Sequence, residues 1–409
     1  MSPSGLGPEY RKLWTASTVS NLGDGITWVA APLLAATLTR DPVLVAGLAF
    51  AHRLPWLLFT LVSGALVDRL DRRRIMWTAD AVRTVMIGLL GLAVYAGLAN
   101  LPLLYAVFFV LGTAETLFDN ASQAILPAVV DRENLEKANG RLFGGQLVAN
   151  EFAGPPLGGV LFAAAAAAPF LLDAGTFAAA AALVLAMRGS FRPGRAERPR
   201  TTMRAEIFEG LRWLWGQPLL RTLAVMLGIM NAVHAAYTSI FVLFAQDILG
   251  LGEVGYGILL TSGALGGLIG SLVADRIIVV FGHGRTLLGS VLLSAAALGG
   301  TAVTGNAFAV GGLFVLVGIC AVVWNVITVS LRQAVIPENL FGRVNSVYRL
   351  LGWGAIPIGA LLGGFLARGL GLTAPMWFGA VVLVALALAT FPLVNNRTLD
   401  EARAGHPPA

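Results

Sequence analysis

Apolar segments long enough to cross a membrane recur along almost the whole chain and constrain its fold more than any other feature. Charged residues make up 12% of the 409 residues and hydrophobic residues 57%, whereas soluble domains carry about 25% charged residues. Because a membrane-spanning helix needs about 20 apolar residues, the sequence predicts an all-α membrane protein with about twelve spans. The spans are expected near 13–38, 43–67, 75–98, 101–126, 139–166, 169–187, 219–247, 253–279, 285–304, 307–331, 343–367 and 373–394.

Basic residues lie almost entirely on one side of these segments. If the N-terminus is inside, the cytoplasmic loops contain the basic clusters at 69–74 and 188–204, whereas the opposite side keeps only Arg40 and Arg368. The positive-inside rule then predicts a multi-pass protein of the inner (plasma) membrane with both termini in the cytoplasm. The net charge of +6 therefore indicates topology, and no nucleic-acid partner is expected. Because residues 1–12 are short and polar, we expect no cleavable signal peptide.

The two halves of the chain share sequence motifs. Residues 64–74 read GALVDRLDRRR and 270–276 read GSLVADR, while QAILP at 123–127 matches QAVIP at 333–337. Such spacing is typical of a duplicated helical bundle. The sequence between the copies is rich in Arg and Pro and ends in an amphipathic pattern. We therefore predict an N-terminal six-helix bundle at 1–187, a cytoplasmic basic linker with an amphipathic helix at 188–216, and a C-terminal six-helix bundle at 217–409.

The repeated loop signature and the central basic linker resemble the major facilitator superfamily over essentially the whole chain. Shorter phrases at 21–25 (NLGDG), 115–119 (ETLFD) and 209–214 (EGLRWL) resemble its twelve-helix drug-efflux group, which includes macrolide and enterobactin exporters. The resemblance implies twelve transmembrane helices in two pseudo-symmetric six-helix bundles, which is the major facilitator fold.

The first loop signature predicts a latch on the cytoplasmic face. Gly64 is expected to allow close helix contact, and Asp68 to cap a neighbouring helix N-terminus. Arg72 can reach an acidic group on an adjacent helix. The resemblance implies that Asp68 and Arg72 hold the outward-facing state closed from inside, with Asp119 as the acidic partner. The second copy keeps Asp275 but has few basic residues, so a symmetric second latch is not expected.

A glycine- and proline-rich stretch lies in the fifth segment, where residues 154–159 read GPPLGG. The two prolines remove backbone donors while the glycines permit close packing, which predicts a bend or pivot. The arrangement resembles the antiporter motif of superfamily exporters, which is rarely found in their importers, and it favours efflux over uptake. The motif residues are Gly154, Pro155, Gly158 and Gly159.

Ionisable side chains within the apolar segments are candidates for proton coupling, because an unpaired charge is costly inside a membrane. Counting along the helices places Asp24, Arg53 and Glu151 nearest the middle of the membrane. We expect Asp24 to carry the proton and Arg53 to tune it by pairing, with a static ion pair as the alternative. Glu151 is expected to be a second proton site or a contact to a cationic substrate. Asp173, near a helix start, is expected to act as a cap. Three further cavity candidates are Asn21, Glu115 and His234.

Nothing in the sequence indicates an enzyme, a metal site or a cofactor. The 4 histidines are scattered without metal-ligand spacing, and neither a phosphate-binding loop nor a nucleophile elbow is present. The sequence predicts a secondary active transporter that works by alternating access, as a proton-coupled antiporter. Two alternatives remain open: a proton-coupled symporter that imports a small metabolite, and a non-transporting sensor on the same scaffold.

The resemblance implies a drug-like natural product or a siderophore as the exported substrate. The other expected partners are protons and membrane lipid, since the arginines that close the first signature could equally anchor that loop to anionic lipid. The chain is expected to function as a monomer.

Overall fold

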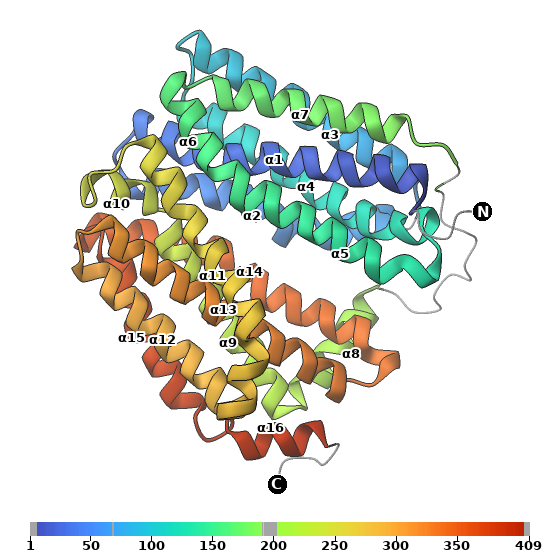
Figure 1. The fold of residues 1–409 in the computed structure, drawn as a ribbon, viewed down its shortest axis with the longest axis vertical. Coiled ribbons are helices and arrows are strands. Elements are labelled where there is room, and N and C mark those ends of the chain that lie inside the picture. The colour runs from blue at the N-terminus through green and yellow to red at the C-terminus, as the bar shows by residue number, and fades with distance from the viewer. Residues whose placement is uncertain (1–5, 68, 190, 192–202, 405–409) are drawn as a thin grey trace. The chain divides into compact units, whose positions relative to one another are not determined.

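The computed structural model of the chain describes residues 6–67, 69–189, 191 and 203–404 (Figure 1). Within these ranges the regular structure is entirely helical. The helices are α1 (Gly7–Leu38), α2 (Pro42–Val67), α3 (Arg72–Tyr95), α4 (Leu101–Val129), the 3-10 turn η1 (Arg132–Asn134), α5 (Leu135–Gln146), the π-helix η2 (Leu147–Ala153), α6 (Gly154–Ala164), α7 (Ala168–Leu185), α8 (Met203–Trp215), α9 (Pro218–Thr238), α10 (Phe241–Asp247), α11 (Glu253–Phe281), α12 (His283–Val303), α13 (Ala307–Val335), α14 (Glu338–Leu370), α15 (Ala374–Thr390) and α16 (Asn396–Arg403).

Among the described residues, 9 helices are long and apolar enough to cross a membrane. Each overlaps one of the predicted apolar segments, with ends that differ by a few residues, so the prediction of a helical, multi-pass membrane protein is confirmed. The predicted segment at 139–166 is divided into α5, η2 and α6, and α15 is a shorter apolar helix. The prediction for the linker end, 206–215, coincides with helix α8.

Short polar side chains start several of the apolar helices. Asn100 accepts a hydrogen bond from the backbone N–H of Leu103 at 3.0 Å, and Asn306 accepts one from Phe308 at 2.9 Å. Asp71 accepts from the N–H of Arg73 at 3.0 Å and thereby caps α3. These caps satisfy backbone donors that have no partner within the first helical turn. They place the starts of α3, α4 and α13 where the polar residue meets the apolar run.

The chain divides into two compact units. The first contains Met1–Arg198 together with Leu251–Thr261, and the second contains Pro199–Gly250 together with Ser262–Ala409. In the first unit, α1 packs against α6 and α7, and α3 packs against α4 and α7. In the second unit, α9 packs against α14 and α15, and α12 packs against α13 and α15. Each unit therefore brings together helices that are far apart in the sequence, such as α1 with α7 and α9 with α14 (Figure 1).

Candidate functional site

A cluster of three charged side chains in the first unit joins α1 and α3. Arg83 donates a hydrogen bond from Nη2 to Oδ1 of Asp80, one turn earlier on α3, at 2.5 Å. Its Nη1 lies 3.8 Å from Oδ2 of Asp24 on α1. The side chains of Arg83 and Asp80 are 3% and 0% exposed, whereas that of Asp24 is 35% exposed. Asp24 is therefore the most exposed member of this cluster.

Arg83 also lies between two aromatic rings. Its Cζ is 4.6 Å from the ring centroid of Phe118 on α4 and 4.4 Å from that of Phe177 on α7. A cation over an aromatic face is stabilised by about 2 kcal/mol when it is desolvated. Because α1, α3, α4 and α7 all supply contacts, the packing of the whole unit determines where this guanidinium lies.

Asp173 of α7 is a third buried charge in this unit, and it contacts α1. Thr27 donates a hydrogen bond to Oδ2 of Asp173 at 2.5 Å, and Thr176 donates one to Oδ1 at 3.0 Å. A side chain at Gly23 would overlap both Asp173 and Thr176, so this glycine lets α1 approach α7. The predicted capping role of Asp173 is wrong, because the helix starts after Ala167 and the carboxylate bonds to side chains within the helix interface.

A second cluster of charges joins α1, α2 and α4. Nε2 of His52 lies 3.1 Å from Oε2 of Glu115, and Nη1 of Arg53 lies 3.9 Å from Oε1 of the same carboxylate. The guanidinium of Arg53 lies over the ring of Trp28, 5.5 Å from its centroid. The three charged or polar side chains are 17 to 27% exposed. We call these four residues the Arg53 cluster.

The structure changes the predicted pairing of the intramembrane charges. The expected pair of Asp24 with Arg53 is wrong, because Asp24 pairs with Arg83 and Arg53 pairs with a different carboxylate. Sequence analysis missed Arg83 and Asp80 as site candidates. The available signal was their charge inside the predicted segment 75–98, where ionisable residues are costly unless they have partners.

Glu151 lies in the π-helical stretch η2, with an exposed side chain. Two residues explain why the helix is irregular there: Pro155 and Pro156 cannot donate backbone hydrogen bonds to the preceding turn. The N–H of Gly154 bonds to a carbonyl five residues earlier. Short π-helical stretches are frequent at functional sites, and this one lies where the sequence predicts a bend or pivot.

The glycines of the antiporter-like motif bring α6 into direct backbone contact with α1. A Cβ added to Gly154 would lie 2.6 Å from Cα of Gly25, and one added to Gly158 would lie 2.5 Å from the carbonyl oxygen of Ile26. Gly159 faces the first turn of α11, which belongs to the same unit. Each of these glycines therefore occupies a position where a larger residue would separate two backbones.

The predicted latch residues are only partly within the described structure. Asp68 lies outside the described residues. Arg72, at the start of α3, donates a hydrogen bond from Nη1 to the carbonyl oxygen of Ala124 on α4 at 2.8 Å. Asp119 lies on the same helix and within electrostatic range of Arg83. The structure thus brings Arg72 to the second half of α4, which also carries Asp119.

The remaining latch candidates are Gly64, for which a close helix contact was expected, and Asp275 of the second copy. The close helix contact expected at Gly64 is not seen among the described residues, since none of their atoms from a neighbouring helix lies within 4 Å of the place where its Cβ would be. Asp275 is an exposed residue within α11, because the helix continues through the second signature to Phe281. The second copy is therefore part of a helix, whereas the first leads into the loop before α3.

The last two cavity candidates make local hydrogen bonds. Nδ2 of Asn21 donates to the carbonyl oxygen of Ser17, one turn earlier on α1, at 2.6 Å. Nδ1 of His234 on α9 lies 2.9 Å from the hydroxyl oxygen of Tyr237. Neither contact links two helices, so these residues are placed by their own helices alone. Within the described chain, no group of three or more His, Cys, Asp or Glu side chains could hold a metal ion.

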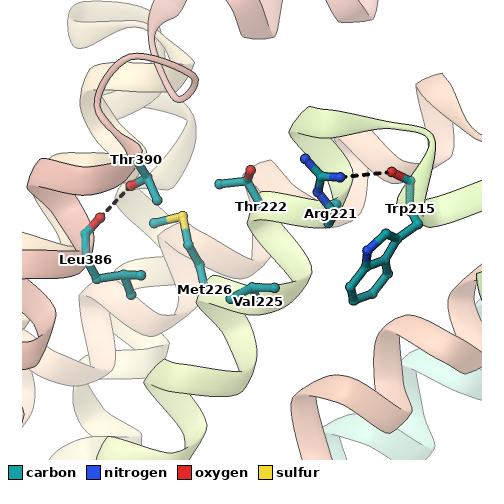
Figure 2. Close-up of a pocket in the computed structure, with 7 residues that line it drawn as sticks. All are labelled: Trp215, Arg221, Thr222, Val225, Met226, Leu386 and Thr390. Atoms are coloured by element: carbon teal, nitrogen blue, oxygen red, sulfur yellow. Dashed lines mark hydrogen bonds between the residues drawn. The ribbon is translucent and has the colours of Figure 1, made fainter.

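A surface pocket of about 330 Å³ lies in the second unit (Figure 2). Arg221 donates a hydrogen bond to the carbonyl oxygen of Trp215 at its edge, at 3.2 Å. The pocket contains none of the site residues predicted from the sequence. It is lined by Trp215, Arg221, Thr222, Val225, Met226, Leu386 and Thr390.

Comparison with known proteins gives similarities over nearly the full length. A family model described as transmembrane secretion effector matches residues 7–406. The chain is 29% identical to the multidrug efflux pump Tap of Mycolicibacterium fortuitum, over 98% of this chain and 99% of Tap. It is 28% identical to the enterobactin exporter EntS of Salmonella typhi, over 87% of this chain and 85% of EntS.

Solved structures support the same fold at low sequence identity. The nucleoside transporter NupG superposes with a TM-score of 0.73 at 11% identity, over 95% of this chain and 99% of NupG. A bacterial homologue of the iron transporter ferroportin in an inward-facing state superposes with a TM-score of 0.70 at 19% identity, over 98% of this chain and 100% of that one. At these identities the likeness concerns the fold alone.

Proposed function

The chain belongs to the transmembrane secretion effector family, a family of major facilitator superfamily transporters, and from this premise we propose that it is a proton-coupled antiporter. It exports a drug-like natural product or a siderophore from the cytoplasm by alternating access. Relatives that match it over nearly their whole length are an efflux pump and an exporter, which supports the outward direction. The antiporter-like motif and its tight packing against α1 support the same direction.

The proposed architecture is twelve transmembrane helices in two six-helix bundles. The protein is proposed to lie in the plasma membrane with both termini in the cytoplasm. Equivalent helix pairs in the two units support this proposal. The contact of α1 with α6 corresponds to that of α9 with α14, and α3 with α7 corresponds to α12 with α15. A duplicated bundle would produce this repetition of contacts. The domain boundaries at 187 and 217 and a monomeric functional state remain part of the proposal.

Proton coupling is assigned to the carboxylate of Asp24. The observation that carries this assignment is its geometry: the side chain is 35% exposed, yet it lies 3.8 Å from the buried guanidinium of Arg83. A coupling group has to exchange protons with water in one state and be compensated inside the protein in another. Glu151, exposed in the π-helical stretch, is the second coupling candidate.

The cytoplasmic latch is proposed on the sequence signature together with one contact. Asp68 and Arg72 are assigned to hold the inner side closed, and Arg72 already bonds to α4. When the latch opens, that bond has to break while α3 moves relative to α4. The basic residues that follow are assigned to anionic lipid at the inner surface.

Transport into inverted membrane vesicles tests the proposed function. With an acidic lumen, an exporter that exchanges protons for substrate accumulates substrate inside such vesicles. A proton symporter would drive substrate out of the same vesicles, and a sensor would show no flux. Candidate substrates come from a growth-protection screen of natural products and siderophores in a host that lacks its own efflux pumps.

A further inference from the structure

Two arginines of the first unit are held very differently. Arg83 is 3% exposed, donates a hydrogen bond to Asp80 and lies between two rings. Arg53 is 27% exposed, and its ion-pair distance of 3.9 Å to Glu115 is too long for a hydrogen bond. Its other contact is the face of Trp28 at 5.5 Å. The guanidinium of Arg53 is therefore held weakly enough to be displaced.

The two groups beneath Arg53 form a receptor for a cation. Trp28 has the aromatic ring that binds cations best, and its side chain is 46% exposed. Glu115 contributes a carboxylate whose Oε1 faces Arg53 while Oε2 is held by His52 at 3.1 Å. An aromatic face beside an oriented carboxylate satisfies both the charge and the flat apolar part of an organic cation.

The position of this receptor suits a transported molecule. Trp28, Arg53 and Glu115 lie about 15, 16 and 21 Å from the predicted outer ends of α1, α2 and α4, at about 1.5 Å per residue. Half of the hydrocarbon thickness is about 15 Å, so the receptor is near mid-membrane. Because partly exposed charges at this depth would be costly against lipid, the exposed sides of these residues face water.

We propose that Trp28 and Glu115 form a binding site for aromatic organic cations, and that Arg53 occupies this site when it is empty. The guanidinium acts as a tethered competitor: the incoming cation displaces it from both the ring and the carboxylate. His52 is a positioning residue that keeps Glu115 oriented after Arg53 leaves. This inference rests on the proposed function, because it names a substrate class for the exporter.

If Arg53 competes with the substrate for Trp28 and Glu115, its substitution should have an effect opposite to that of most binding-site substitutions. Removing Arg53 should strengthen binding of a cation, whereas removing most residues of a binding site weakens it. Arg83 also contributes positive charge near Glu115, but it is buried and bonded to Asp80, so Arg53 is the cation whose loss frees the site. The second unit offers a matched control: Arg349 lies over Trp353 at 5.3 Å, without a carboxylate partner among the described ion pairs.

The test measures equilibrium binding of tetraphenylphosphonium to the purified full-length protein in lipid nanodiscs. The control ligand is tetraphenylborate, an anion that has the same four phenyl rings and nearly the same shape. Glu115→Gln should weaken tetraphenylphosphonium binding about tenfold, the equivalent of about 1.4 kcal/mol. Trp28→Leu should weaken it about threefold or more. Arg53→Met should strengthen it about threefold or more, and Arg349→Met should leave it unchanged.

Each other outcome overturns the inference. Weaker cation binding in Arg53→Met, or tetraphenylborate binding that requires Arg53, would mean that the arginine itself recognises an anionic ligand. The absence of tetraphenylphosphonium binding to the wild type, or unchanged binding in Glu115→Gln, would also overturn it. Misfolding cannot imitate the gain expected for Arg53→Met. Because binding is measured without a gradient, a protein that binds as expected but fails to accumulate substrate in inverted vesicles contradicts the proposed function instead.

Discussion

Arg83 of α3 and Asp24 of α1 form an ion pair between the two helices, with Nη1 and Oδ2 3.8 Å apart. The arginine is buried and the aspartate is partly exposed. The two partners therefore differ in what they contribute: the buried cation stabilises the unit, and the exposed carboxylate is available for exchange with water. Separate substitutions can distinguish these two contributions.

Substitution of Arg83 should destabilise the protein. Arg83→Gln leaves the buried carboxylate of Asp80 without its charged partner, and breaking a buried pair in this way costs about 3–5 kcal/mol. The unfolding temperature of the purified protein should fall clearly, as followed by circular dichroism in detergent. Arg53→Gln is the matched control, because its partly exposed side chain makes no hydrogen bond in the described structure. Equal stability of the two variants would contradict the structural role of Arg83.

Substitution of Asp24 should separate transport from its driving force. Asp24→Asn should abolish accumulation driven by a pH gradient while substrate still exchanges down its own gradient, because the pathway remains without the titrating group. Uptake by inverted vesicles, with and without the gradient, measures both activities. Asp131→Asn, an exposed residue before η1, should behave like the wild type. If Asp24→Asn and Glu151→Gln both retain full gradient-driven transport, the coupling group lies elsewhere.

The contact between α1 and the π-helical stretch η2 should not tolerate a single added methyl group. A Cβ at Gly25 would overlap the backbone carbonyl of Asn150, and backbone atoms cannot move aside as a side chain can. Gly25→Ala should therefore lower thermal stability and transport. Gly175→Ala in α7, where nothing lies within 4 Å of the new atom, should be neutral or stabilising by up to about 1 kcal/mol. A tolerated Gly25→Ala would show that the two backbones are farther apart.

The start of α1 should loosen as the pH falls. Glu9 receives a hydrogen bond from Lys12 at 2.9 Å and one from the N–H of Arg188 at 2.8 Å. Chiefly because of Lys12, the pKa of Glu9 is below its ordinary value of 4.5. A lowered pKa stabilises the folded state above the ordinary value, and this contribution is lost as the pH falls through the lowered pKa.

Hydrogen exchange at the first amides of α1 measures this effect. Glu9→Gln should exchange faster than the wild type near pH 7. The two rates should begin to converge below pH 4.5, the ordinary value for this carboxyl, and become equal below the lowered pKa. The effect is expected to be small, because the ion pair with Lys12 is partly exposed. A difference between the two proteins that persists in acid would mean that the carboxylate charge is not what holds the helix.

Loss of the latch should change the conformational distribution without preventing folding. Asp68→Asn is expected to shift the population toward the inward-open state and to slow transport, because the latch stabilises the outward-facing state. Spin-label distances across the cytoplasmic side measure this distribution. Arg74→Gln, assigned to lipid, is the matched control. An unchanged distribution in Asp68→Asn would exclude the latch.

Local sequence patterns predicted the positions of most helices. The predicted segment 43–67 corresponds to α2 (Pro42–Val67), and 307–331 corresponds to the larger part of α13 (Ala307–Val335). The irregular helix at the two prolines was also visible, because proline lacks a backbone donor wherever it occurs. The sequence did not indicate that Arg83 is the ion-pair partner of Asp24. Depth along a helix could be counted, but its rotation toward a neighbour could not.

The sequence by itself determined that this chain is a helical membrane protein and where its helices lie. The physical reason is that lipid offers no hydrogen-bond partners, so each apolar segment has to satisfy its own backbone within the segment. Only the tertiary structure decided which charges meet: Arg83 with Asp24, and Arg53 with Glu115. These pairs join residues more than fifty positions apart. Their formation depends on how the helices rotate and pack, which no local pattern specifies.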